Sequence, residues 1–252
     1  MDRIVAALAA QQDDLEAIVA PLDDQGWQAP SRCAGWTVAD VVLHLAQTDE
    51  MAVASLDGRL AAAIDAAAAA GAGPAADVDQ AAALMVESER GLPPAAVLDR
   101  WRAGAHALRA ALGAHDPGER VLWVAGELTV RTLATTRLAE TWIHTGDVAE
   151  PLGHEVAADD RLWHIARLAW RTLPYAFARA GRTLAGPVAF SLAAPGGDTW
   201  HFVPDEPAVT TIEGSAVELC TVAGQRADAA DTDLQGEGPD AAAVLELVRT
   251  FA

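Results

Sequence analysis

The sequence has no lysine: all 17 basic residues are arginine, and they face 36 aspartates and glutamates, for a formal net charge of -19 at pH 7. A surface this acidic repels phosphate backbones and anionic lipid headgroups. Long uncharged apolar runs are also missing, since no stretch of about 18 residues is apolar and free of charge, as a membrane-spanning helix requires. We therefore expect neither a nucleic acid nor a membrane as a partner.

Cysteine is scarce, with only Cys33 and Cys220 in 252 residues. One disulfide between them is chemically allowed, but so sparse a set is more typical of free thiols in a reducing compartment. The first twenty residues carry three acids after a short apolar run and lack the pattern of a secretory signal. We therefore expect a cytoplasmic protein. Hydrophobic residues make up 52% of the chain, which predicts a packed core and argues against disorder.

Helical periodicity dominates the first 150 residues. The second helix has a clear start, because Thr37 can cap it and Asp40 follows three residues later. The expected helices are Asp2–Leu22, Thr37 to about Gly71 through an alanine-rich run, Asp79–Leu112 with a bend at 91–94, and about Leu128 to Pro151, with a loop at 71–79. Four such helices predict a bundle, a fold that often holds ligands between facing side chains.

The last hundred residues have a different pattern. A helix is expected at Asp159–Arg179, and residues 186–224 then alternate apolar and polar side chains between the turn sequences PGGD and PDEP, which predicts hairpin strands. A final helix is expected at Asp240–Phe251. The fold class is therefore α+β, with a helical bundle at 1–154 and a small α/β domain with an antiparallel sheet at 155–252.

The fourth helix carries four ionisable residues within an arc of roughly 80°. They are Arg137, Glu140, His144 and Asp147. A narrow solvated face is one explanation. The other is burial, because Trp142 and Ile143 lie on different sides of this helix and both favour burial, and buried polar groups then need partners.

Glu140 and His144 are four residues apart, so their side chains can converge on one divalent cation. His44, at the edge of the apolar stripe of the second helix, is the candidate third ligand, although a single histidine bonded to a backbone group is the commoner case. Two histidines and one carboxylate leave a position open, as a catalytic metal requires. The donors suit zinc, and also nickel, iron or manganese. Cys33 is expected to be a structural thiol near this end of the bundle.

The motifs GWTVADVVLHL (35–45) and RLAETWIHTGDVAEPLG (137–153) together resemble the DinB-like bundle of the mycothiol-dependent maleylpyruvate isomerase family of actinobacteria. The resemblance covers the bundle and extends more weakly to the C-terminal domain, which in that family resembles sterol-carrier proteins. It implies a metal, usually zinc, held by His44, Glu140 and His144, with Asp147 contacting a ligand or the helix end. It also implies a catalytic arginine, for which Arg226 is the candidate. Here Gln225 separates that arginine from the preceding glycine. The alternative is that Arg226 is a solvated loop residue without a catalytic role.

The resemblance further implies mycothiol as cofactor or co-substrate. In an isomerase, a metal-bound thiolate adds to a cis double bond, the adduct rotates and the thiol leaves; in an S-transferase, the thiolate attacks an electrophile and stays. Two other functions remain open from the residues alone: a metal-dependent hydrolase with metal-bound water as nucleophile, and a non-catalytic small-molecule-binding protein. The expected partners are a small-molecule substrate and a thiol, with the chain a monomer or a homodimer.

Overall fold

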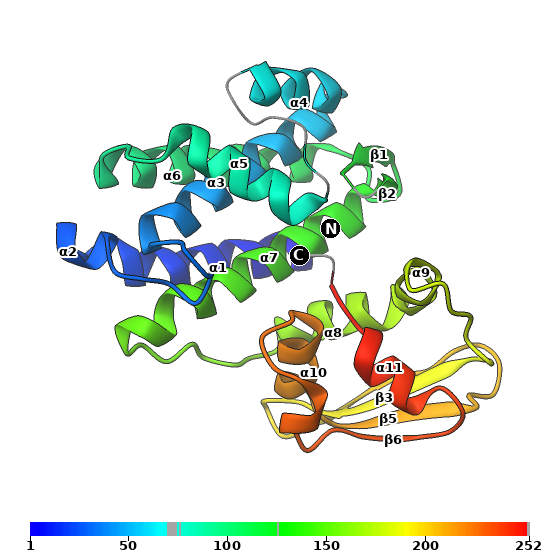
Figure 1. Ribbon diagram of the computed structural model, residues 1–252. Helices are drawn as coiled ribbons and strands as arrows, with labels where there is room; N and C mark the ends of the chain where they lie inside the picture. The colour runs from blue at the N-terminus through cyan, green and yellow to red at the C-terminus, as the bar shows by residue number, and fades with distance from the viewer. Residues whose placement is uncertain (70–74, 76, 125, 251–252) are drawn as a thin grey trace. The chain divides into compact units, whose positions relative to one another are not determined.

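The computed structural model (Figure 1) describes residues 1–69, 75, 77–124 and 126–250. The chain divides into two compact units, Met1–Val156 and Ala157–Ala252. The first is helical and the second combines helices with a sheet, so the predicted α+β class is confirmed. No helix within the described residues is both long enough and apolar enough to cross a membrane.

Four long helices form the bundle of the first unit. They are α1 (Asp2–Val19), α3 (Val38–Leu56), α6 (Pro94–Ala114) and α7 (Val130–Ala149). Helix α3 packs against α6 and α7, and α1 packs against the same two helices. Each helix contributes fully buried leucines to the interior, such as Leu8, Leu45, Leu108 and Leu138. Burial of one such side chain stabilises the fold by about 1.5–3 kcal/mol, so the apolar stripes are what hold the bundle together.

Two of the expected helices are each interrupted. The second ends at Leu56, where Gly58 takes a left-handed φ of +69° that only glycine adopts at no steric cost, and the alanine-rich run forms a separate helix. The third is likewise two helices, because Gly91 has a φ of +93° and Pro94 then starts α6. The separate helices are α4 (Leu60–Ala69) and α5 (Val78–Glu89). Most of the loop expected at 71–79 lies outside the described residues.

The remaining elements of this unit are short. They are α2 (Asp24–Trp27), β1 (Arg120–Trp123), β2 (Gly126–Thr129) and the 3-10 turn η1 (Glu150–Leu152). The antiparallel β1–β2 hairpin was not expected from the sequence, and Leu128 belongs to it. Helix α7 therefore begins two residues later than predicted, at Val130, where the Thr129 hydroxyl accepts a hydrogen bond from the Thr132 amide.

The second unit has a four-stranded sheet with helices on one face (Figure 1). Its elements are α8 (Leu162–Arg171), α9 (Leu173–Arg179), β3 (Val188–Ala193), β4 (Thr199–Phe202), β5 (Thr210–Ser215), α10 (Ala216–Ala223), η2 (Ala229–Asp231), β6 (Gln235–Glu237) and α11 (Ala241–Leu247). Phe190, Leu192 and Ile212 point from the central strands into the core of this unit.

Three expectations for this unit need correction. The sheet order is β4-β3-β5-β6, and its outer pairs are antiparallel as expected, but the central pair β3–β5 is parallel. Residues 203–209 carry the chain from β4 to the other side of β3, so that β5 runs in the same direction as β3. Residues 216–223 form α10 and not a strand, because Ser215 caps them. The helix expected at Asp159–Arg179 breaks at Thr172, next to Leu173 and Pro174.

Candidate metal centre

His44 is positioned by the capped start of α3. The Thr37 hydroxyl accepts from the Asp40 amide at 3.2 Å, and the Asp40 carboxylate accepts from the Thr37 amide at 2.9 Å. This reciprocal pair satisfies two of the free amides at the helix end and fixes where the helix begins. Seven residues after Thr37, His44 points into the bundle with 6% of its surface exposed.

Helix α7 is buried along the face that carries its ionisable residues. Arg137, Glu140, His144 and Asp147 are each less than a tenth exposed. The explanation of this face as a solvated strip is therefore excluded. Because an ionised side chain without a partner is costly to bury, the contacts of these four residues define the chemistry of the bundle core.

Three of the predicted residues come together. Glu140 Oε1 lies 2.9 Å from His44 Nε2 and 3.4 Å from His144 Nε2. The imidazole centroids are 5.0 Å apart and their planes are nearly perpendicular, at 77°. All three ligand atoms lie within 4.8 Å of one another. Trp36, just before the cap of α3, packs beside His44 with the ring centroids 5.2 Å apart and the planes tilted by 54°.

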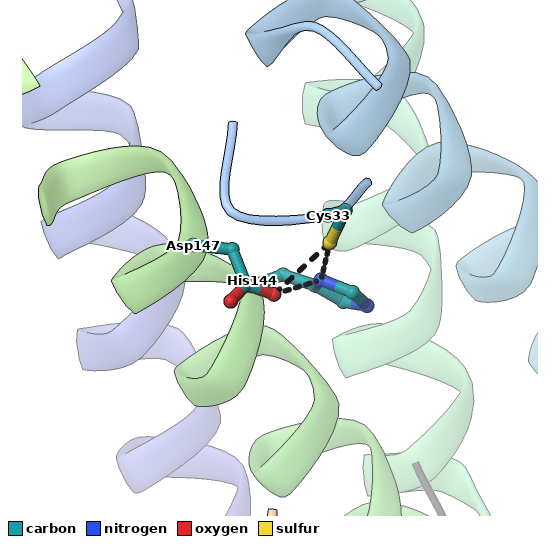
Figure 2. Close-up of side chains that lie close together, drawn as sticks. All are labelled: Cys33, His144 and Asp147. Atoms are coloured by element: carbon teal, nitrogen blue, oxygen red, sulfur yellow. Dashed lines mark hydrogen bonds and ion pairs between the residues drawn. The ribbon is translucent and has the colours of Figure 1, made fainter. Parts of the chain in front are cut away.

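The other nitrogen of His144 faces a second cluster (Figure 2). His144 Nδ1 lies 2.9 Å from Asp147 Oδ2, and the Cys33 thiol donates to the same oxygen at 3.2 Å. Cys33 Sγ is also 3.7 Å from His144 Nδ1. Asp147 thus contacts a candidate ligand through the imidazole edge opposite Glu140, the arrangement that fixes a metal-binding tautomer.

Cys33 lies on the loop before α3, and this loop is tied to the end of α7. The Arg32 amide donates to the Asp147 carbonyl at 3.0 Å, and the Arg32 side chain pairs with Glu150 at 2.6 Å. No spacing in the sequence joins Cys33 to His144, which lies 111 residues away. The expected position of Cys33 near this end of the bundle is confirmed, but its contacts with His144 and Asp147 were not predicted.

The charges of the core are strongly coupled. Burial opposes ionisation of Glu140, but hydrogen bonds from His144 and His44 outweigh it and hold the pKa of this carboxyl well below its usual value. Burial also favours neutral His144, yet Asp147, Cys33 and Glu140 raise its pKa well above the usual value. Burial lowers the pKa of His44. The core therefore holds an ionised Glu140 carboxylate between two imidazoles, and His144 must give up a proton before it can bind a cation.

A buried ion pair lies one turn from the cluster and was not expected from the sequence. Arg137 Nε donates to Asp49 Oδ1 at 3.1 Å, and its Nη2 donates to the Thr48 hydroxyl at 2.8 Å. Asp49 is fully buried, and its Oδ2 has no hydrogen-bond partner among the described residues. Burial, opposed by Arg137, raises the pKa of Asp49 to about 6.

The predicted catalytic arginine, Arg226, belongs to the second unit. It follows α10, where Gln225 has a left-handed φ of +58°. The Arg226 guanidinium donates to the Gly224 carbonyl at 3.0 Å, so part of its hydrogen-bonding capacity serves its own turn. Its catalytic role stays a prediction.

Comparisons with known proteins give one family model, two relatives and two solved structures. A model of the "Mycothiol maleylpyruvate isomerase N-terminal domain" matches residues 8–149. Two uncharacterized Mycobacterium tuberculosis proteins, Rv0036c of strain H37Rv and MT0041 of strain CDC 1551, are 36% identical over 249 residues, which covers 98% of this chain and 95% of each relative.

Crystal structures of a mycothiol-dependent maleylpyruvate isomerase and of a mutant of it are similar to this chain, with TM-scores of 0.60 and 0.61. Both comparisons cover 95% of each chain at 17% sequence identity. At this identity the similarity establishes a shared fold, which includes the C-terminal unit that the family model does not reach.

Proposed function

Because the chain belongs to the mycothiol maleylpyruvate isomerase family, we propose that it is a divalent-metal-dependent enzyme that uses mycothiol as cofactor or co-substrate, as an isomerase or an S-transferase. The observation that carries this proposal is the convergence of one ligand atom each from His44, Glu140 and His144 within 4.8 Å inside the bundle, with Glu140 Oε1 between the two Nε2 atoms. The substrate would be an unsaturated or electrophilic small molecule.

The donor set fits a divalent cation. Two imidazole nitrogens and one carboxylate oxygen are a set that zinc binds at catalytic sites, where the fourth position stays open. Asp147 supports this assignment, because its contact with His144 Nδ1 keeps the Nδ1 proton in place and leaves the Nε2 lone pair for a metal. Zinc is the proposed ion, and nickel, iron or manganese would accept the same donors.

The roles of the residues follow from their contacts. A bound divalent cation supplies stabilisation of a thiolate at neutral pH, which makes a thiol cofactor nucleophilic. His44, Glu140 and His144 hold the cation, and Asp147 orients the His144 ring. Trp36 lies against the His44 ring, and its proposed role is to limit the access of water on that side. Arg226 is proposed to hold an anionic group of the substrate, the interaction for which a guanidinium is best suited.

The test begins with the metal content of the purified, untagged full chain. We expect about one divalent ion per chain in the wild type, as a single site of this kind predicts, and its loss in His144→Ala. His115→Ala is the matched control, because His115 also pairs with a glutamate four residues away, Glu119 at 2.9 Å. This variant should keep the ion. A wild-type chain that stays metal-free after supplementation would contradict the proposal.

Calorimetric titration with mycothiol then tests the cofactor. Mycothiol should bind the metal-loaded wild type and should not bind His44→Ala or Glu140→Ala. Hydrolysis that needs the metal but no thiol would replace the proposal with a hydrolase. Ligand affinity that survives metal removal would replace it with a binding protein.

A further inference from the structure

We propose that Cys33, His144 and Asp147 form a second, thiolate-containing metal site, and that it is an alternative to the site of His44, Glu140 and His144. Figure 2 shows the three side chains directed toward one another from the loop before α3 and from the last turns of α7. The alternation between the two sites rests on the proposed function, because both use His144. The second site itself does not.

The distances suit direct coordination. The three pairs of donor atoms are 3.2 Å apart for Sγ and Oδ2, 3.7 Å for Sγ and Nδ1, and 2.9 Å for Nδ1 and Oδ2. A tetrahedral zinc ion with bonds of about 2.3 Å to sulfur and about 2.0–2.1 Å to nitrogen and oxygen separates such donors by roughly 3.3–3.6 Å. Small side-chain shifts are therefore enough to enclose a cation, with a fourth position left to water.

Charge and access favour a thiophilic ion. A Cys33 thiolate and the Asp147 carboxylate balance both charges of a divalent cation, whereas the other site offers one carboxylate. On binding, the Cys33 S–H bond breaks, the proton leaves to solvent, and the sulfur donates an electron pair to the metal. Cys33 is partly exposed, so an ion can reach the sulfur although His144 and Asp147 are buried. Thiolate ligands select soft ions such as zinc, copper(I) and, by the same chemistry, cadmium.

One imidazole links the two sites. A neutral imidazole has one N–H and one nitrogen lone pair. A metal at Nε2 requires the proton on Nδ1, where Asp147 accepts it at 2.9 Å; a metal at Nδ1 requires the proton on Nε2, where Glu140 accepts it at 3.4 Å. Each carboxylate thus supports one tautomer. One ion per chain is expected across the two sites, and a soft ion held by Cys33 takes His144 away from the proposed catalytic ion.

Cobalt(II) titration of the chelator-treated full chain tests this inference, because a thiolate bound to cobalt gives a sulfur-to-metal charge-transfer band in the near ultraviolet. We expect this band in the wild type, a stronger band in Glu140→Gln, which retains only the thiolate site, and no band in Cys33→Ser. Cys220→Ser is the matched control and should keep the band, since Cys220 is the second of the two cysteines in the sequence and is fully buried in the second unit.

The outcomes separate this site from the proposed function. If Cys33→Ser binds cobalt without the sulfur band, the site of His44, Glu140 and His144 is intact. If Cys33→Ser binds no cobalt, the proposed function is contradicted and the second site is not. Absence of the band from both the wild type and Glu140→Gln at saturating cobalt overturns the second site. Two cobalt ions in each wild-type chain would refute the alternation.

Discussion

The buried pair of Asp49 and Arg137 should make the stability of the protein depend on pH. The sign of this dependence shows whether desolvation of Asp49 or its attraction to Arg137 dominates. Burial raises the pKa of Asp49 from 3.8 to about 6 despite the guanidinium beside it. The folded state then holds the Asp49 proton more tightly than the unfolded state, so the stability that this proton supplies is complete below about pH 3.8 and is lost as the pH rises through about 6. At about 1.36 kcal/mol per pH unit, this displacement corresponds to a loss of about 3 kcal/mol.

Substitution of Asp49 by asparagine tests the sign. The new amide keeps an acceptor for Arg137 and cannot ionise, so the variant resembles the wild type with Asp49 protonated at every pH. The free energy of unfolding of Asp49→Asn minus that of the wild type should therefore increase by about 2.4 kcal/mol between about pH 4 and about pH 7, most of the full effect of about 3 kcal/mol. The other carboxylates titrate in both proteins and cancel in the difference. Urea unfolding followed by far-ultraviolet circular dichroism, at several pH values, measures it.

The opposite result is equally well defined. If attraction to Arg137 outweighs desolvation, removal of the charged partner leaves a buried guanidinium unpaired and costs about 3–5 kcal/mol at neutral pH. The difference would then decrease as the pH rises. A flat or decreasing difference would refute the conclusion that desolvation controls this carboxyl.

Two further predictions concern stability. Thr37→Ala removes the hydroxyl that accepts from the Asp40 amide and should lower the free energy of unfolding of the first unit by about 1 kcal/mol in urea titration; an unchanged midpoint would show that this cap does not stabilise α3. In the second unit, Gly238→Ala places a Cβ over the Val209 carbonyl oxygen at a residue with a φ of +106°. It should lower the free energy of unfolding by about 1–3 kcal/mol more than Gly197→Ala, where φ is +93° and no atom of the described residues lies within 4 Å of the new Cβ. Equal losses in thermal unfolding would mean that the backbone at 238 adjusts.

Local patterns in the sequence predicted much of the helical unit. The apolar periodicity located the four long helices, and the order Thr37 to Asp40 correctly predicted the capping box of α3. These features depend on residues within one or two turns of each other, which is why a linear sequence reveals them. The helix breaks at Gly58 and Gly91 were harder to predict, because a glycine within a helical pattern can remain helical or adopt a left-handed φ. Only the packing of the surrounding chain selects between the two.

The sequence by itself determined that Glu140 and His144 share a face of α7, because the helical repeat places residues four apart on one side. It also determined that His44 lies on another amphipathic helix. Only the tertiary structure decided that these helices meet with 2.9 Å between His44 and Glu140, that Cys33 reaches Asp147 across 114 residues, and that β3 and β5 pair in parallel. Helical periodicity is a property of neighbouring residues, whereas these contacts exist only after the whole core packs and closes the intervening loops, so no local pattern encodes them.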